Sequence, residues 1–125
     1  MDGEITPAEV EALIDTDEDV RVVDIRPEAA YVRGHIPGSE NVPFAALTRA
    51  VERFEGAERV VTVCPHGQSS VQAANLIASY EGVADDATVQ SMAGGLVAWD
   101  GDLERAERVA EDEGPDTTDA PDAPF

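Results

Sequence analysis

Residues 60–70 read VVTVCPHGQSS, a stretch that joins three kinds of local structure. Positions 60–63 are all β-branched, which is typical of a buried strand. Pro65 and Gly67 then interrupt the run and predict a tight turn. After the turn, apolar residues recur at helical spacing from 71 to 77. A strand that passes through a turn into a helix is the repeating unit of α/β proteins.

The only cysteine of the chain, Cys64, opens this turn. A tight turn after a strand leaves successive backbone N–H groups pointing into one concavity, and the following helix adds the positive end of its dipole. A free thiol titrates near ~8.5, so only roughly 3% is charged at pH 7, and such a cradle favours the thiolate. Free cysteine is also among the most buried residue types. The turn alone therefore leaves two interpretations of Cys64, a nucleophile and an inert packing residue.

Strands and helices alternate along the rest of the chain. Thr6 begins the first helix as its N-cap, with Pro7 at the first helical position and Glu9 closing a capping box, and the helix is expected to end near residue 14. Strands are predicted at 20–24, 41–42, 60–63 and 88–92, and further helices at 27–32, 44–54, 70–80, through Trp99 and near 103–110. This alternation predicts an α/β fold with a mainly parallel central sheet and helices on both faces.

The length of 125 residues fits one domain with a single core, which we assign to residues 1–110. Residues 111–125 are rich in Pro and Asp and predict a disordered acidic tail.

Acidic residues dominate the charge balance, since 27 acids against 8 bases give a formal net charge of −19, and every base is Arg. The predicted tail holds six acids and no base, so −13 remains on residues 1–110. Such a charge disfavours nucleic acid and anionic membranes as partners. Molar salt shrinks the Debye length to about 3 Å and screens repulsion of this kind. The composition is similar to that of a halophilic cytoplasmic protein and indicates a haloarchaeal origin, with an ordinary acidic protein as the alternative.

The remaining residue types exclude several kinds of site. One cysteine cannot form an intramolecular disulfide, and with His35 and His66 as the only histidines we expect no metal site and no cofactor. The acidic start lacks the features of a signal peptide, and no segment approaches membrane-spanning length. The expected location is the cytoplasm, with no membrane partner.

Three separated stretches of the chain form a larger pattern. The first is VVDIR at 22–26, followed by Tyr31 and by GHIPGS at 34–39; the second is the strand and six-residue loop within 60–70; the third is Gly94-Gly95 followed by Trp99. In this order and spacing they resemble the single-domain rhodaneses, a sulfurtransferase family. The resemblance covers nearly the whole folded part and implies that Cys64 is the reactive residue.

The resemblance further implies persulfide chemistry. The Cys64 thiolate would take the outer sulfur of a small donor, such as thiosulfate or 3-mercaptopyruvate, and pass it to cyanide, a thiol or a sulfur-acceptor protein. Charge on the donor and on the persulfide requires hydrogen-bond donors. Backbone N–H groups of the loop are expected to supply them, namely those of His66, Gly67, Gln68, Ser69 and Ser70. Pro65 has no N–H to give, and Gly67 permits a left-handed backbone.

Three loop positions limit this interpretation. Rhodaneses that prefer thiosulfate usually carry Arg at the sixth position of the loop, where this chain has Ser69, and loops of the mercaptopyruvate type end in a small hydroxylated residue, so both donors stay open. His66 could contact substrate when charged, or be an exposed histidine without a role. Ser70 stands where the related Cys-x5-Arg phosphatases need Arg, which argues against phosphatase activity.

Asp24 and Arg26 lie at the end of a strand, at the edge where open α/β sheets build sites, so they could support the loop or form a fixed ion pair between two connections.

The sequence leaves two function classes open. One is a sulfurtransferase; the other is a catalytically weak or silent rhodanese-like module for binding or redox sensing. The presence of Cys64 favours the enzyme, because silent modules often lose the cysteine.

Overall fold

The computed structural model describes residues 1–16, 19–83 and 86–105. In this part of the chain, five parallel strands form one sheet in the order β1-β5-β4-β2-β3. The strands are β1 (Glu4–Ile5), β2 (Val20–Asp24), β3 (Glu40–Asn41), β4 (Arg59–Val63) and β5 (Thr88–Met92). The helices are α1 (Pro7–Thr16), α2 (Glu28–Arg33), α3 (Leu47–Ala50) and α4 (Ser69–Ala78), with short 3-10 turns at Phe44–Ala46, Val51–Phe54 and Leu96–Ala98.

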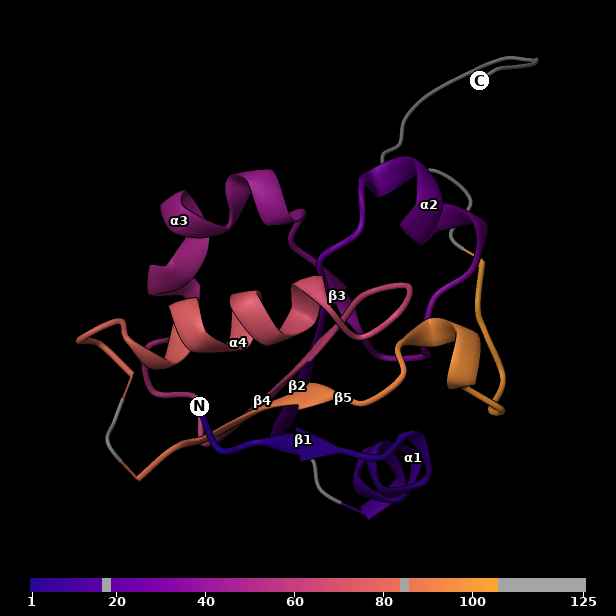
Figure 1. The fold of residues 1–125 in the computed structure, drawn as a ribbon, viewed down its shortest axis with the longest axis horizontal. Helices are drawn as coiled ribbons and strands as arrows, with labels where there is room; N and C mark the ends of the chain where they lie inside the picture. The colour runs from indigo at the N-terminus through magenta and orange to yellow at the C-terminus, as the bar shows by residue number, and fades with distance from the viewer. Residues whose placement is uncertain (17–18, 84–85, 106–125) are drawn as a thin grey trace.

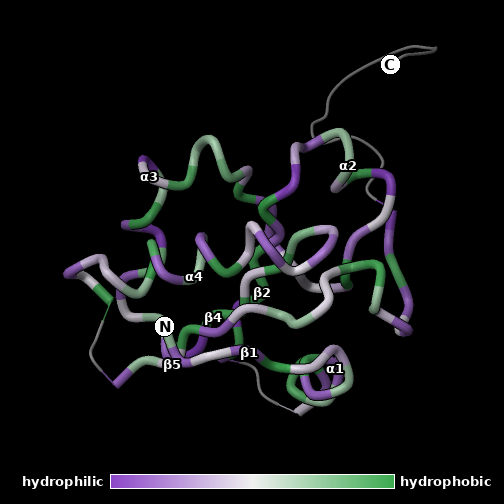
Figure 2. The backbone as a smooth tube through the Cα atoms, in the orientation of Figure 1, coloured by the Kyte–Doolittle hydropathy of each residue, from purple (hydrophilic) through white to green (hydrophobic). Residues whose placement is uncertain are grey.

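Helices cover both faces of the sheet, as the sequence predicts, with α3 and α4 on one side and α1 on the other (Figure 1). Val23 and Val60 pack in the core that α3 and α4 cover. Val22 and Val61 pack in the opposite core, together with Val10 of α1. Successive residues of a strand point to opposite faces, so adjacent valines serve different cores. In Figure 2 the central strands β2 and β4 are accordingly mostly hydrophobic, whereas α1 alternates between hydrophobic and hydrophilic residues.

The start of α1 confirms the predicted capping box. The Glu9 N–H donates to Thr6 Oγ1 at 3.1 Å, and the Thr6 N–H donates to Glu9 Oε1 at 3.0 Å. The bond from the Thr6 backbone, followed by the bond from its hydroxyl, holds the pKa of Glu9 below its ordinary value. The helix continues to Thr16, two residues beyond the expected end.

Several element boundaries differ from the predictions. The two-residue edge strand β1 was not expected, and β3 lies one residue earlier than the predicted strand at 41–42. The expected helix at 44–54 is divided into a short α-helix between two 3-10 turns, which are common connectors.

The prediction of a helix near 103–110 is wrong in its described part. Glu104 forms an antiparallel bridge with His35, and the two backbones exchange hydrogen bonds of 2.9 and 2.8 Å. This pairing satisfies the backbone groups that a helix would use. Residues 106–110, the domain end at 110 and the predicted tail at 111–125 lie outside the described residues.

Candidate active site

Cys64 follows β4 directly, at the carboxyl edge of the sheet, and is only 2% exposed. Because β4 lies between β2 and β5, the loop that begins at Cys64 leaves from the middle of the sheet. Open parallel sheets build their sites outside the carboxyl ends of the strands. The thiol therefore occupies the position in this fold that is best suited to chemistry.

Hydrogen-bond donors surround the sulfur of Cys64. The backbone N–H groups of Gly67 and Ser70 donate to Sγ at 3.1 and 3.3 Å. The Ser70 Oγ lies 3.3 Å from the same sulfur. Ser70 belongs to the first turn of α4, where backbone N–H groups lack the usual partner one turn earlier in the helix, and its N–H is used for the sulfur.

These contacts change the acidity of the thiol. Burial raises the pKa of Cys64, because an apolar environment disfavours the charged form. The Ser70 hydroxyl and the backbone N–H groups of Ser70, His66 and Gly67 act in the opposite direction and outweigh burial, so the pKa of Cys64 is lowered from its ordinary value. The loop therefore favours a thiolate, which is the nucleophilic form of cysteine.

The shape of the loop depends on glycines from two parts of the chain. Gly67 has a left-handed backbone with φ of 82° and is buried. A Cβ atom at Gly67 would lie 2.8 Å from the backbone nitrogen of Gly94, and one at Gly95 would lie 2.5 Å from the Cys64 carbonyl oxygen. Only glycine fits where two backbones approach so closely.

The segment after Gly95 also holds the loop by hydrogen bonds. The Leu96 N–H donates to the Cys64 carbonyl at 2.9 Å, and the Val97 N–H donates to the Pro65 carbonyl at 3.1 Å. Trp99 packs against the core on the α1 side and donates its indole N–H to the Asp102 carbonyl at 3.1 Å. The Gly-Gly and Trp elements therefore act together, since one contacts the loop and the other fixes the segment to the core.

This arrangement of loop, glycines and sheet has a counterpart among known proteins. Residues 6–102 match the family described as the rhodanese-like domain. The chain belongs to the rhodanese-like family. The match includes four of the five strands and omits only β1. It confirms the family and the fold that the sequence motifs indicate.

Relatives of this rhodanese-like chain include named enzymes. The thiosulfate sulfurtransferase GlpE of Pseudoalteromonas translucida is 40% identical over 83 residues, which span 66% of this chain and 75% of that protein. The protein of the same name from Pseudomonas fluorescens (strain SBW25) is 33% identical over 95 residues, or 76% of this chain and 82% of that protein. The crystal structure of a thiosulfate sulfurtransferase from Pseudomonas aeruginosa superposes with a TM-score of 0.72 at 27% identity and covers 86% of this chain and 20% of that one. These relatives give no support for the predicted haloarchaeal origin.

The predicted residues of the rhodanese-like loop fall into two groups. His66, Gly67 and Ser70 direct backbone N–H groups to the Cys64 sulfur. Gln68 and Ser69 lie exposed at the start of α4, and no hydrogen bond joins them to the sulfur among the described contacts. A role for their N–H groups in binding a donor molecule therefore stays a prediction.

Asp24 and Arg26 form the ion pair that was one of the two interpretations from the sequence, at and just after the end of β2. The Arg26 guanidinium donates to Asp24 Oδ2 at 2.8 Å and to the Gly34 carbonyl at 2.6 Å. The Ile25 N–H between them donates to the Val63 carbonyl, one residue before the cysteine. The pair thus joins the end of β2 to Gly34, which follows α2. The backbone of Ile25, between the two residues, contacts β4, the strand that precedes Cys64.

Two buried hydroxyl residues near the sulfur were not predicted. Thr62 and Ser91 are register partners on β4 and β5, and both are fully buried. The Ser91 hydroxyl lies 2.7 Å from Ser70 Oγ, and the Thr62 hydroxyl donates to the Ser70 carbonyl at 2.6 Å. For Thr62 the signal was a hydroxyl residue in the otherwise apolar run at 60–63, because buried parallel strands are usually apolar on both faces. The strand of Ser91 also contains Thr88 and Gln90, so it carried no such signal.

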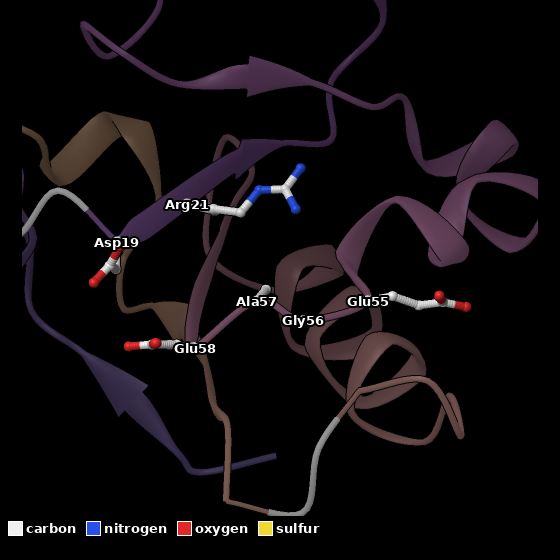
Figure 3. Close-up of a pocket in the computed structure, with 6 residues that line it drawn as sticks. All are labelled: Asp19, Arg21, Glu55, Gly56, Ala57 and Glu58. Carbon is white, nitrogen blue, oxygen red and sulfur yellow. The ribbon is translucent and has the colours of Figure 1, made fainter.

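Surface pockets also lie at the other end of the sheet. One is lined by Asp19, Arg21, Glu55, Gly56, Ala57 and Glu58 near the starts of β2 and β4, and its arginine turns away from Asp19 and Glu58 (Figure 3). Arg21 instead binds Glu40 at 2.8 and 2.9 Å, so this pocket offers no free cation to an anion.

Among the described residues there is no cluster of His, Cys, Asp or Glu side chains suited to a metal ion. None of their helices combines the length and apolar character needed to cross a membrane.

Proposed function

We propose that this rhodanese-like protein is a sulfurtransferase that carries sulfane sulfur as a persulfide on Cys64. The observation that carries the proposal is the donor set on the sulfur, with the Gly67 N–H at 3.1 Å, the Ser70 N–H at 3.3 Å and the Ser70 hydroxyl at 3.3 Å. The relatives named thiosulfate sulfurtransferase support the reaction class. We also propose that the protein acts in the cytoplasm and needs no cofactor.

In the first half-reaction, the Cys64 thiolate attacks the outer sulfur of the donor. For thiosulfate, a bond forms between Sγ and that sulfur, the sulfur–sulfur bond of the donor breaks, and sulfite leaves with the bonding electron pair. The product is a persulfide anion on Cys64, so the total charge is unchanged. Fixed N–H groups that stabilise a thiolate also stabilise the charge that develops along this path.

In the second half-reaction, an acceptor attacks the outer persulfide sulfur. Cyanide, a small thiol or a cysteine of an acceptor protein forms a bond to that sulfur, and the sulfur–sulfur bond breaks. The electron pair returns to Sγ, which regenerates the thiolate. Formation of a covalent intermediate divides one difficult transfer into two easier steps.

We propose thiosulfate as a donor, because it is the donor in the names of the relatives. The exposed Ser69 gives the dianion no cationic partner. Binding then depends on backbone N–H groups and on the start of α4, which are weaker partners than a charged Arg. We therefore expect weak thiosulfate binding, and 3-mercaptopyruvate remains a second candidate donor.

Intact-mass spectrometry after incubation with each donor tests the proposal. We expect the wild-type chain to gain the mass of one sulfur atom, and a reductant or cyanide to remove it. Cys64→Ser should gain nothing while keeping the wild-type circular dichroism spectrum, because the exchange changes little volume at a loop position. A wild-type chain that gains no sulfur from either donor, or a Cys64→Ser variant that gains as much as wild type, overturns the proposal.

The second candidate function is a weak or silent rhodanese-like module that binds a partner or senses oxidants. The low exposure of Cys64, 2%, favours it, because access for a donor is restricted. Peroxide treatment with mass spectrometry discriminates between the two functions. A module should show reversible oxidation of Cys64 without sulfur gain from thiosulfate or 3-mercaptopyruvate.

A further inference from the structure

A chain of three polar side chains leads from the Cys64 sulfur into the interior. The Ser70 Oγ lies 3.3 Å from Cys64 Sγ and 2.7 Å from Ser91 Oγ. Ser70 and Ser91 are both 0% exposed, and Cys64 is 2% exposed. Protons on buried hydroxyl groups need protein partners, because an unsatisfied buried donor is costly.

The neighbouring hydroxyl group of Thr62 is already committed. It donates to the Ser70 carbonyl at 2.6 Å, and the Gln90 carbonyl lies 3.4 Å from it. The described contacts of the Ser91 hydroxyl run to Ser70 alone. Ser91 is therefore positioned to act on the sulfur through Ser70.

The number of hydrogen atoms on the side chains of Cys64, Ser70 and Ser91 depends on the charge of Cys64. With a thiol, each of the three side chains carries one hydrogen atom, but only two contacts join them, so one hydrogen atom has no acceptor among the three. With a thiolate, two hydroxyl hydrogens fill the two contacts. Ser91 then donates to Ser70, and Ser70 donates to the sulfur. With the thiolate, therefore, both hydroxyl donors, those of Ser70 and Ser91, have an acceptor.

We propose that Ser91 is a positioning residue for the Cys64 thiolate, because its hydroxyl donates to Ser70 Oγ and thereby orients the Ser70 hydroxyl toward the sulfur. The thiol proton leaves to solvent when the thiolate forms, and both hydroxyl groups turn toward Cys64. This inference rests on the proposed function insofar as the thiolate is the attacking group. It adds Ser91, on β5, to a site otherwise built from the loop and α4.

Charged groups near the sulfur are few, which increases the weight of these neutral donors. The β5 strand Thr88–Met92 and the helix Ser69–Ala78 contain no titratable residue, and Arg59 lies at the opposite end of β4. On the β2 side, Asp24 and Arg26 are paired with each other. The loop adds His66, whose side chain is exposed.

The pH dependence of Cys64 alkylation by iodoacetamide tests the proposal on the full chain. We expect a wild-type midpoint below that of an ordinary thiol, since the donors on the sulfur favour the thiolate. Ser91→Ala should move the midpoint to higher pH and lower the rate at pH 7 about threefold to tenfold, the effect of weakening one hydrogen bond to the charged form. The control is Ser39→Ala, a serine at 9% exposure that donates to the Ile36 carbonyl at 2.7 Å and should leave the profile unchanged.

A matched pair at the same position separates the hydroxyl from packing. Ser91→Thr and Ser91→Val differ only by a hydroxyl group in place of a methyl group, and both residue types suit a strand. We expect the threonine variant to keep the wild-type midpoint and the valine variant to shift it upward. Equal midpoints in the two variants, or an unshifted Ser91→Ala profile, overturn the proposal.

Alkylation needs no sulfur donor, so this test is independent of sulfur transfer. A protein that forms no persulfide would refute the proposed function and still give an interpretable alkylation profile. Conversely, an unshifted Ser91→Ala profile in a chain that accepts sulfur would refute the role of Ser91 alone.

Discussion

Asp24 and Arg26 show how a single pair of side chains can hold the end of a central strand. The Asp24 side chain is 1% exposed and that of Arg26 is 15% exposed, so water screens the pair weakly. Arg26 also donates to the Gly34 carbonyl, and the Asn41 amide donates to the carbonyls of Asp24 and Arg26. The ion pair therefore lies at the junction of β2, β3 and the turn after α2.

We predict that Asp24→Asn destabilises the fold by about 3 kcal/mol, because it leaves a largely buried guanidinium without its carboxylate. Glu40→Gln is the control, since it removes the carboxylate partner of Arg21 and Arg53, whose side chains are 30% and 51% exposed, and Glu40 itself is 28% exposed. Exposed pairs contribute about 1 kcal/mol or less, so the control should lose far less stability. Urea unfolding followed by circular dichroism measures both, and equal losses would contradict the prediction.

The same variants distinguish the two roles that the sequence leaves open for Asp24 and Arg26. If the pair only fixes the strand end, Asp24→Asn should keep the wild-type pH profile of Cys64 alkylation while it lowers stability. If the pair supports the loop chemically, the profile should shift as well. We expect the first result, because the described bonds of the two side chains run to each other, to the Arg26 backbone N–H and to the Gly34 carbonyl.

At the scale of elements, the active-site loop is shaped by contact with a segment that is distant in sequence, residues 94–97. The turn that precedes Leu96 presents two left-handed glycines to the loop, and the next two N–H groups bind the Cys64 and Pro65 carbonyls. These two bonds fix the start of the loop, and the Gly67 and Ser70 N–H groups further along it face the sulfur. The segment after Gly94 therefore helps to set the shape of the loop.

We predict that Gly95→Ala destabilises the protein by about 2 kcal/mol or more and displaces the loop donors. A Cβ atom at Gly95 would lie 2.5 Å from both the Cys64 carbonyl oxygen and the Gly67 nitrogen, and backbone atoms cannot yield as a flexible side chain can. Thermal melting and the pH profile of alkylation are the two measurements. We expect a lower melting temperature and a Cys64 midpoint at higher pH.

Gly56→Ala is the control for the strain of a positive φ. Gly56 has φ of 79°, close to the 67° of Gly95, but nothing lies within 4 Å of a Cβ atom built there. It should therefore cost only the strain of a left-handed alanine, about 1 kcal/mol. A Gly95→Ala variant as stable as Gly56→Ala would show that the close approach of the two backbones is unimportant.

Local signals in the sequence predicted most of these elements. The capping box at Thr6 and the β-branched run at 60–63 are short-range patterns, and both formed as expected. The strand β1 has only two residues and forms by pairing with β5, and Glu104 is extended because it pairs with His35. Such pairing partners are distant in sequence, and periodicity within a segment does not reveal them.

The site was predictable to a similar degree. Cys64 and the N–H groups after it follow from a strand, a turn and a helix that are adjacent in sequence. Ser91 reaches the site only because β5 lies beside β4 in the sheet. The strand order brings it there, and the sequence alone does not specify that order.

At the scale of the whole molecule, the dominant property is an excess of negative charge. Eight arginines can neutralise at most eight of 27 acids, and three arginines are already engaged by Asp24 and Glu40 in the described part of the chain. The other acids repel one another across the surface. This repulsion opposes the compact state most strongly at low ionic strength, where the Debye length is longest.

We predict that the melting temperature rises as KCl increases from low concentration into the molar range, because salt screens this repulsion. KCl is preferable to a sulfate salt, since sulfate strengthens the burial of apolar surface in proteins generally and would raise the melting temperature for another reason. A chain that ends at Ala110 lacks six acids but keeps a formal charge of −13, so it should retain most of the salt effect. Differential scanning calorimetry of both chains across the KCl series measures the effect. A melting temperature that stays flat up to molar KCl would refute salt adaptation and leave the acidic composition without a role in stability.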